Sequence, residues 1–107
     1  MTIIRARVVL VTVPRGGKAE SLAEGAVEAR LAACVNIVPG VISVYRWKGR
    51  VHRDAESLLV IKTTAAKLKA LERWLKERHP YETPEFLVLG VSSGSKEYLS
   101  WLMEVAR

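Results

Sequence analysis

Three side chains from two distant parts of the chain are candidate metal ligands: Cys34, His79 and Glu85. Thiolate and imidazole suit soft and borderline metals, and a carboxylate six residues after the histidine can add an oxygen ligand. Each also has a structural alternative. A lone cysteine between a helix and a strand is typically a small buried residue, and an imidazolium at a helix C-terminus favours the helix dipole. Glu85 can equally be an exposed charge or the ion-pair partner of Lys62.

A second set of potential ligands lies on the returning strand of a predicted hairpin, where His52, Asp54 and Glu56 alternate. Side chains two residues apart in a strand point to the same side, so the three share one face. The spacing is compatible with weak surface metal binding, although a solvated strand face is the simpler explanation. Five aromatic residues are expected in the core or at an interface; they are Tyr45, Trp47, Tyr81, Tyr98 and Trp101.

Apolar patterning predicts the elements that position these residues. The predicted strands cover residues 3–13, 35–47, 51–63 and 86–91. The predicted helices cover residues 18–33, residues 64–78 and a short C-terminal segment. Thr64 and Ser95 are candidate N-caps for the second and third helices.

Two interruptions shape the middle of the chain. Pro39-Gly40 predicts a bulge or bend in the second strand, and Lys48-Gly49-Arg50 predicts the turn of a hairpin. After the bulge, period-two alternation places Val41, Ser43, Tyr45 and Trp47 on one face.

The order β-α-β-β-α-β with an extra C-terminal helix predicts an α+β ferredoxin-like plait with an antiparallel sheet and an extended middle hairpin. Such a plait covers only one face of its sheet with helices. Val9 and Val11 point one way and Val8 and Leu10 the other, so the first strand is apolar on both faces. We therefore expect a second subunit to cover the open face.

Composition bounds the function. The chain has 107 residues, which predicts a single domain over residues 1–107. It has no apolar run long enough to span a membrane and no signal-peptide pattern. Its single cysteine excludes an internal disulfide. We therefore expect a cytoplasmic protein.

Seventeen basic and eleven acidic residues give a net charge of +6. The basic residues are dispersed among glutamates, so we expect no specific nucleic-acid binding.

Five segments together resemble the CutA family of divalent-cation tolerance proteins, and the resemblance covers nearly the whole chain. They are residues 31–40 (LAACVNIVPG), 45–49 (YRWKG), 61–63 (IKT), 79–85 (HPYETPE) and 98–102 (YLSWL).

The resemblance implies a tight homotrimer of ferredoxin-like subunits, similar in shape to PII signalling proteins, with no catalysed reaction. It also implies an inter-subunit cleft near Trp47, Lys62, His79, Tyr81 and Glu85. Copper binding in bacterial relatives is associated with a cysteine on the first strand and with histidines before the Pro-Tyr motif. This chain has Val11 and Arg78-His79 at the corresponding places.

We therefore expect a trimeric protein that binds copper or another divalent cation weakly and responds to metal ions, and not an enzyme. The alternative is a PII-like signalling or scaffold trimer whose clefts bind a small anion or a partner protein. An acylphosphatase-type activity at the Pro14–Gly17 loop has little support, because no nucleophile and base occur at a recognisable spacing.

Overall fold

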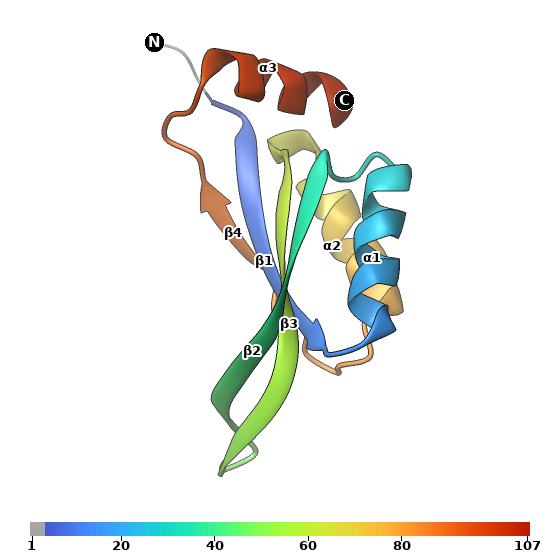
Figure 1. The fold of residues 1–107 in the computed structure, drawn as a ribbon, viewed down its shortest axis with the longest axis vertical. Helices are drawn as coiled ribbons and strands as arrows, with labels where there is room; N and C mark the ends of the chain where they lie inside the picture. Colours follow the sequence, from blue (N-terminus) through green and yellow to red (C-terminus); the bar gives the residue numbers. More distant parts are fainter. Residues whose placement is uncertain (1–3) are drawn as a thin grey trace.

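A computed structural model describes residues 4–107 of the chain (Figure 1). The elements are β1 (Ala6–Pro14), α1 (Gly17–Glu28), β2 (Cys34–Trp47), β3 (Arg50–Thr64), a 3₁₀ turn (Ala65–Lys67), α2 (Leu68–Arg78), β4 (Leu87–Gly90) and α3 (Lys96–Val105). Every strand pairing is antiparallel and the order in the sheet is β2-β3-β1-β4. The structure confirms the predicted plait. The expected start of the first strand at residue 3 lies outside the described residues.

Helices α1 and α2 cover one face of the sheet (Figure 1). Alternate residues of β1 and β3 point into this core, where Val9, Val11, Leu59 and Ile61 are buried. Their neighbours Leu58 and Val60 are only partly buried. The sequence of this half of β3, Leu58 to Ile61, is apolar throughout and predicts a continuous buried run; that prediction is wrong, because helices cover only one face of the sheet.

Helix α1 ends earlier than predicted, at Glu28 rather than at residue 33. Arg30 adopts a left-handed conformation with φ 59°, which terminates the helix. The backbone N–H of Leu31 donates to the Ala26 carbonyl. Thr63 Oγ1 donates to the Leu31 carbonyl at 2.7 Å and so ties this turn to β3.

Of the two predicted helix N-caps, Thr64 is wrong and Ser95 is confirmed. Thr64 remains in β3 with an extended backbone and makes no side-chain cap bond, and helix α2 begins only at Leu68. The next residue, Ala65, donates its N–H to the Arg5 carbonyl, so strand pairing persists where a helix was expected. Ser95 caps α3 as predicted, because its hydroxyl accepts from the Tyr98 N–H at 3.1 Å.

The middle hairpin extends beyond the rest of the molecule, at the opposite end from α3 (Figure 1). Lys48 and Gly49 have φ values of 51° and 78°, as a two-residue hairpin turn requires. The predicted bulge is confirmed: Val38 pairs with Leu58 and Val41 with Glu56, so three steps along β2 match two along β3. We call the segment beyond the bulge, residues 41–56, the arm.

The second sheet face is open over most of its area, as the sequence predicted. Helix α3 covers only the end of this face, where Leu102 and Ala106 pack on Ala6 and Ala33. Leu87 and Leu89 of the edge strand β4 are 56% and 48% exposed. Within residues 4–107, no helix has the length and apolar character needed to cross a membrane.

Candidate functional site

A groove of about 700 Å³ lies between the arm and the loop that follows α2. Arm residues, Thr12 of β1 and residues 80–85 form its walls. Its lining contains three carboxylates and two aromatic residues of the arm together with Tyr81, but no lysine, arginine or histidine. The carboxylates belong to Glu56, Glu82 and Glu85. A chain with a net charge of +6 therefore presents a locally acidic groove.

His79 holds the loop of this groove in place. Helix α2 ends here, since Pro80 follows and the His79 N–H already donates to the Leu75 carbonyl at 2.7 Å. His79 is 8% exposed. Its Nδ1 accepts from the Tyr81 N–H at 3.1 Å, so Nε2 carries the proton that bonds to the Thr12 carbonyl at 2.8 Å. Both ring nitrogens are thus engaged with the backbone.

Glu56 is the most deeply placed acid of the groove, with only 4% of its surface exposed. It lies on β3 opposite Pro14 of β1 and Val41 of β2. The Tyr81 hydroxyl donates to Glu56 Oε2, which links the loop to the sheet. Burial, followed by the hydrogen bond and the charge of Glu56, raises the pKa of Tyr81 far above its ordinary value, so the phenol stays protonated.

Glu85 and Glu56 line the same groove. Burial raises the pKa of Glu85, and the negative charge of Glu56 raises it further. Like charges that share a partly buried site oppose each other's ionisation. A bound cation would relieve this repulsion, and an anion would increase it.

The arm contributes further polar and aromatic side chains next to the groove. Asp54 accepts from the Tyr45 hydroxyl, and Tyr45 stacks on the His52 ring at 5.5 Å between centroids. The hydrogen bond to Asp54 raises the pKa of Tyr45. Alternation predicted that each strand's set shares a face, and the register shows that the two sets share the same face: His52, Asp54 and Glu56 lie opposite Tyr45, Ser43 and Val41.

The structure brings together some of the residues that the sequence singled out. Glu85, Trp47 and Tyr81 line the groove. His79 does not line it but accepts a hydrogen bond from the Tyr81 N–H and so holds the loop in place. Cys34 and Lys62 lie elsewhere. They form a cross-strand pair near Val8, four residues from Thr12 along β1, which is about 13 Å.

Lys62 donates to Asn36 Oδ1 and forms no ion pair with Glu85. Val11, at the position of the copper-associated cysteine of relatives, is 1% exposed within the helix-covered core. Among residues 4–107, no group of three or more His, Cys, Asp and Glu side chains is placed to hold one metal ion.

Glu56 was a candidate ligand from sequence only as a member of the alternating set with His52 and Asp54, and its central position in the groove and the contribution of Glu82 were not predicted. A second sequence signal marks Glu56, because it lies at the junction between the polar and apolar halves of β3. Its burial depends on the loop after α2 folding back over it, which strand alternation cannot reveal.

Comparison with known proteins places this chain in one family. The family model "CutA1 divalent ion tolerance protein" matches residues 7–105. The Thermus thermophilus divalent-cation tolerance protein CutA is 50% identical over 97 residues, which cover 91% of this chain and 94% of the relative. The solved Thermus thermophilus structure superposes with a TM-score of 0.90 at 49% identity, covering 92% of this chain and 96% of the other.

Two further relatives broaden the comparison. A chloroplastic CutA protein of Arabidopsis thaliana is 46% identical over 100 residues, and the match spans 94% of this chain but only 55% of that relative. A solved structure from Nostoc sp. PCC 7120, described as a PII-like protein CutA in its apo form, has a TM-score of 0.88 at 34% identity. It covers 94% of this chain and 97% of the other. With a family match over nearly its whole length, this chain belongs to the CutA1 divalent ion tolerance family.

Proposed function

We propose that this protein acts in divalent-cation tolerance by binding a divalent cation in the acidic groove, as a homotrimer in the cytoplasm and without catalysing a reaction. The observation that carries the proposal is the groove lining: three carboxylates without one cationic side chain, in a chain whose net charge is +6. Carboxylate oxygens are good ligands for hard and borderline divalent cations.

Glu56 and Glu85 are the acids that would hold the cation. Both carboxylates line the groove, and burial together with the charge of Glu56 raises the pKa of Glu85. One subunit supplies too few converging ligands for a closed site. Water or a neighbouring subunit would complete the coordination shell, as is usual for weakly held divalent ions.

Copper is the metal that the family resemblance suggests, with His79, Glu85 and Cys34 as the ligands predicted from sequence. Ligation by His79 would require one of its two backbone hydrogen bonds to break. Cys34 lies about 13 Å along the sheet from the Thr12 end of the groove. We therefore propose that Cu(II) binds with a Kd in the micromolar range or weaker, on the order of −8 kcal/mol at best.

The homotrimer is proposed from the uncovered apolar face and the arm. Leu87 and Leu89 on β4 are exposed, as are Val44 and Val51 on the arm. Burying such surface against another copy is favourable by about 25 cal/mol per Å². The cleft expected between subunits, with Trp47, Lys62 and Tyr81, would then extend the groove. Size exclusion with light scattering should return about three times the subunit mass, and a folded monomer would contradict the proposal.

Calorimetric titration tests the cation site. Mn(II) and Cu(II) are titrated separately into the wild type, Glu56→Gln and Glu85→Gln, because Gln keeps the shape and removes the charge. Each variant should bind at least about tenfold more weakly, since a charge-assisted contact contributes about 1.5–3 kcal/mol. Glu24→Gln, on the exposed side of α1, is the matched control and should bind as the wild type does. Unchanged affinity in both groove variants would refute the site.

The second candidate function is a PII-like signalling trimer that binds a small anion, which the name of the Nostoc relative favours. The acidic groove disfavours an anion there. Lys62 on the open sheet face is the basic residue available for this alternative. Binding of inorganic phosphate that is lost in Lys62→Gln and unaffected in Glu85→Gln would support it over the cation site.

A further inference from the structure

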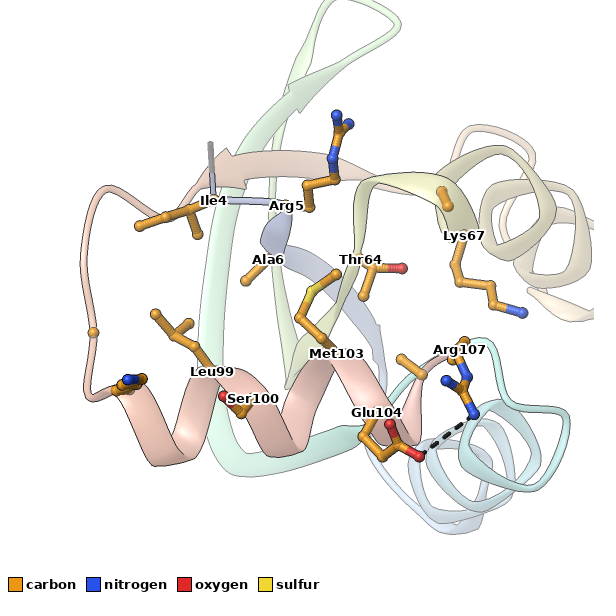
Figure 2. A pocket seen from close by; sticks show the side chains of 14 residues that line it. Ile4, Arg5, Ala6, Thr64, Lys67, Leu99, Ser100, Met103, Glu104 and Arg107 are labelled. Atoms are coloured by element: carbon orange, nitrogen blue, oxygen red, sulfur yellow. Dashed lines mark ion pairs between the residues drawn. The ribbon is translucent and has the colours of Figure 1, made fainter. Parts of the chain in front are cut away.

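A second hollow, of about 1,100 Å³, lies between α3 and the chain segments where β1 begins and β3 ends (Figure 2). We propose that this α3 cavity binds an amphipathic anion, a carboxylate with an aliphatic tail of medium length. Its charged end would lie at Lys67 and Arg107, and its tail along Met103 towards Leu99 and Ile4.

The lining has the charge that such a ligand requires. Four basic residues and a single acid border the α3 cavity: Arg5, Lys67, Lys96, Arg107 and Glu104. Figure 2 shows the charged ends of Lys67 and Arg107 at the same end of the cavity, whereas Arg5 points away from α3. Lys67 forms no ion pair within residues 4–107.

Glu104 is a weak competitor for the anion. It pairs with Arg107 at 3.5 Å, and the two side chains are 68% and 78% exposed. An exposed ion pair of this kind contributes little to stability, so a ligand carboxylate can replace Glu104 at Arg107.

The floor of the cavity is apolar and remains open because small residues surround it. Ala6, Ala66 and Ala106 stand where larger side chains would fill the space. Met103 extends from α3 towards Thr64, with Leu99 and Ile4 further along (Figure 2). A hydrocarbon tail would bury the exposed part of Met103, and each methylene removed from water should tighten binding by about fourfold.

A second copy of this chain is a poorer occupant than an anion. The protruding tip of the arm carries Arg46, Lys48 and Arg50, so the basic lining of the α3 cavity would repel it. The cavity is also separate from the acidic groove. Ala6 and Thr12 mark the two sites on β1, and the six residue steps from one to the other correspond to about 20 Å.

The test is calorimetric titration of sodium decanoate, below its micelle concentration, into the full chain. One saturable site per subunit is expected. Lys67→Gln should weaken binding by about tenfold, through loss of a charge-assisted contact. Met103→Glu should abolish binding, because it places a carboxylate on the path of the tail. Lys69→Gln, an exposed neighbour on α2, is the matched control and should bind as the wild type does.

Two probes separate the contributions of head and tail. Decyltrimethylammonium has the same tail with a positive head, and inorganic phosphate has the charge without a tail. Both should bind at least tenfold more weakly than decanoate. Equal binding of the cationic probe would overturn the proposal by revealing a non-specific apolar surface, and equal binding of phosphate would overturn the role of the tail. Absence of decanoate binding, or its persistence in both Lys67→Gln and Met103→Glu with light scattering unchanged, would also overturn it.

Discussion

The two hollows of the molecule lie towards opposite ends of β1 and carry opposite charge. The groove beside the arm is acidic, and a connected set of hydrogen bonds through His79, Tyr81 and Glu56 fixes its wall. The α3 cavity is basic, and its wall is held mainly by the apolar contacts of Leu102 and Ala106. The net charge of the chain, +6, has the same sign as the lining of the α3 cavity and the opposite sign to the lining of the groove. Local lining therefore decides which ligand each hollow suits.

The largest effect is expected from a change that damages only the α3 cavity. Leu102 is 2% exposed and packs with Ala6 and Ala33. Leu102→Ala should lower the free energy of unfolding by about 3 kcal/mol, as buried leucine truncations do. Urea unfolding measures the loss. Mn(II) binding in the groove should not change, and a parallel drop in Mn(II) affinity would contradict the independence of the two hollows.

A smaller effect is expected from the residue that organises the groove. His79→Ala leaves the Thr12 carbonyl and the Tyr81 N–H without their partners, at a cost of about 2 kcal/mol in the free energy of unfolding. His52→Ala, on the arm, should cost less than about 0.5 kcal/mol. Thermal or urea unfolding compares the two variants.

The same His79 variant separates two roles for the histidine. If His79 only positions the loop, Cu(II) and Mn(II) should weaken by the same factor in His79→Ala. If it ligates copper, Cu(II) should weaken far more than Mn(II), because imidazole favours copper. Decanoate binding at the α3 cavity should be unchanged in either case.

The pH dependence of cation binding in the groove gives a further test, which concerns Glu85. Burial and the charge of Glu56 raise the pKa of Glu85 above the ordinary value near ~4.3. Cation binding should therefore weaken on acidification from a higher pH than an ordinary glutamate would give. The contribution of Glu85 to stability has the opposite direction: it is fully present below the unfolded pKa and is lost as the pH rises through the raised folded value. Glu85→Gln should thus gain in Tm relative to the wild type between pH 4 and pH 7, and a relative loss would contradict the assigned direction.

The smallest effect is expected from the one acid of the basic hollow. Glu104→Gln removes an exposed ion pair with Arg107, so the free energy of unfolding should change by less than about 0.5 kcal/mol. Decanoate should bind about twofold more tightly, because the acid that competes for Arg107 is gone. Weaker binding in this variant would place the anion away from Arg107.

Local patterns in the sequence predicted most of the fold. Alternation in β1, the bulge at Pro39-Gly40, the turn at Lys48-Gly49 and the Ser95 cap each depend on neighbouring residues only, and each is confirmed. The errors arose where tertiary contacts overrode local preference. One is the end of α1, where the turn around Arg30 is tied to β3 through Thr63.

The candidate site was less predictable for the same reason. The motif around His79 and Tyr81 identified the loop that lines the groove. Alternation along the strands could not predict that this loop folds over Glu56. Cys34 and Lys62 stand in equally prominent segments, yet β2 and β3 place them beside each other and away from the groove. Proximity between segments far apart in sequence is a property of the assembled sheet.

The β2 bulge decides which residues of the two arm strands lie opposite each other. With the bulge, Val41 pairs with Glu56, so Tyr45 and Trp47 face the same side as Glu56. If the same sequence paired without a bulge, β2 would slip by one residue against β3, and Arg46 would take that side in place of Tyr45 and Trp47. The slipped pairing would bring a guanidinium to the acidic side of the arm. Pro39-Gly40, which do not line the groove, thus help to keep the groove acidic.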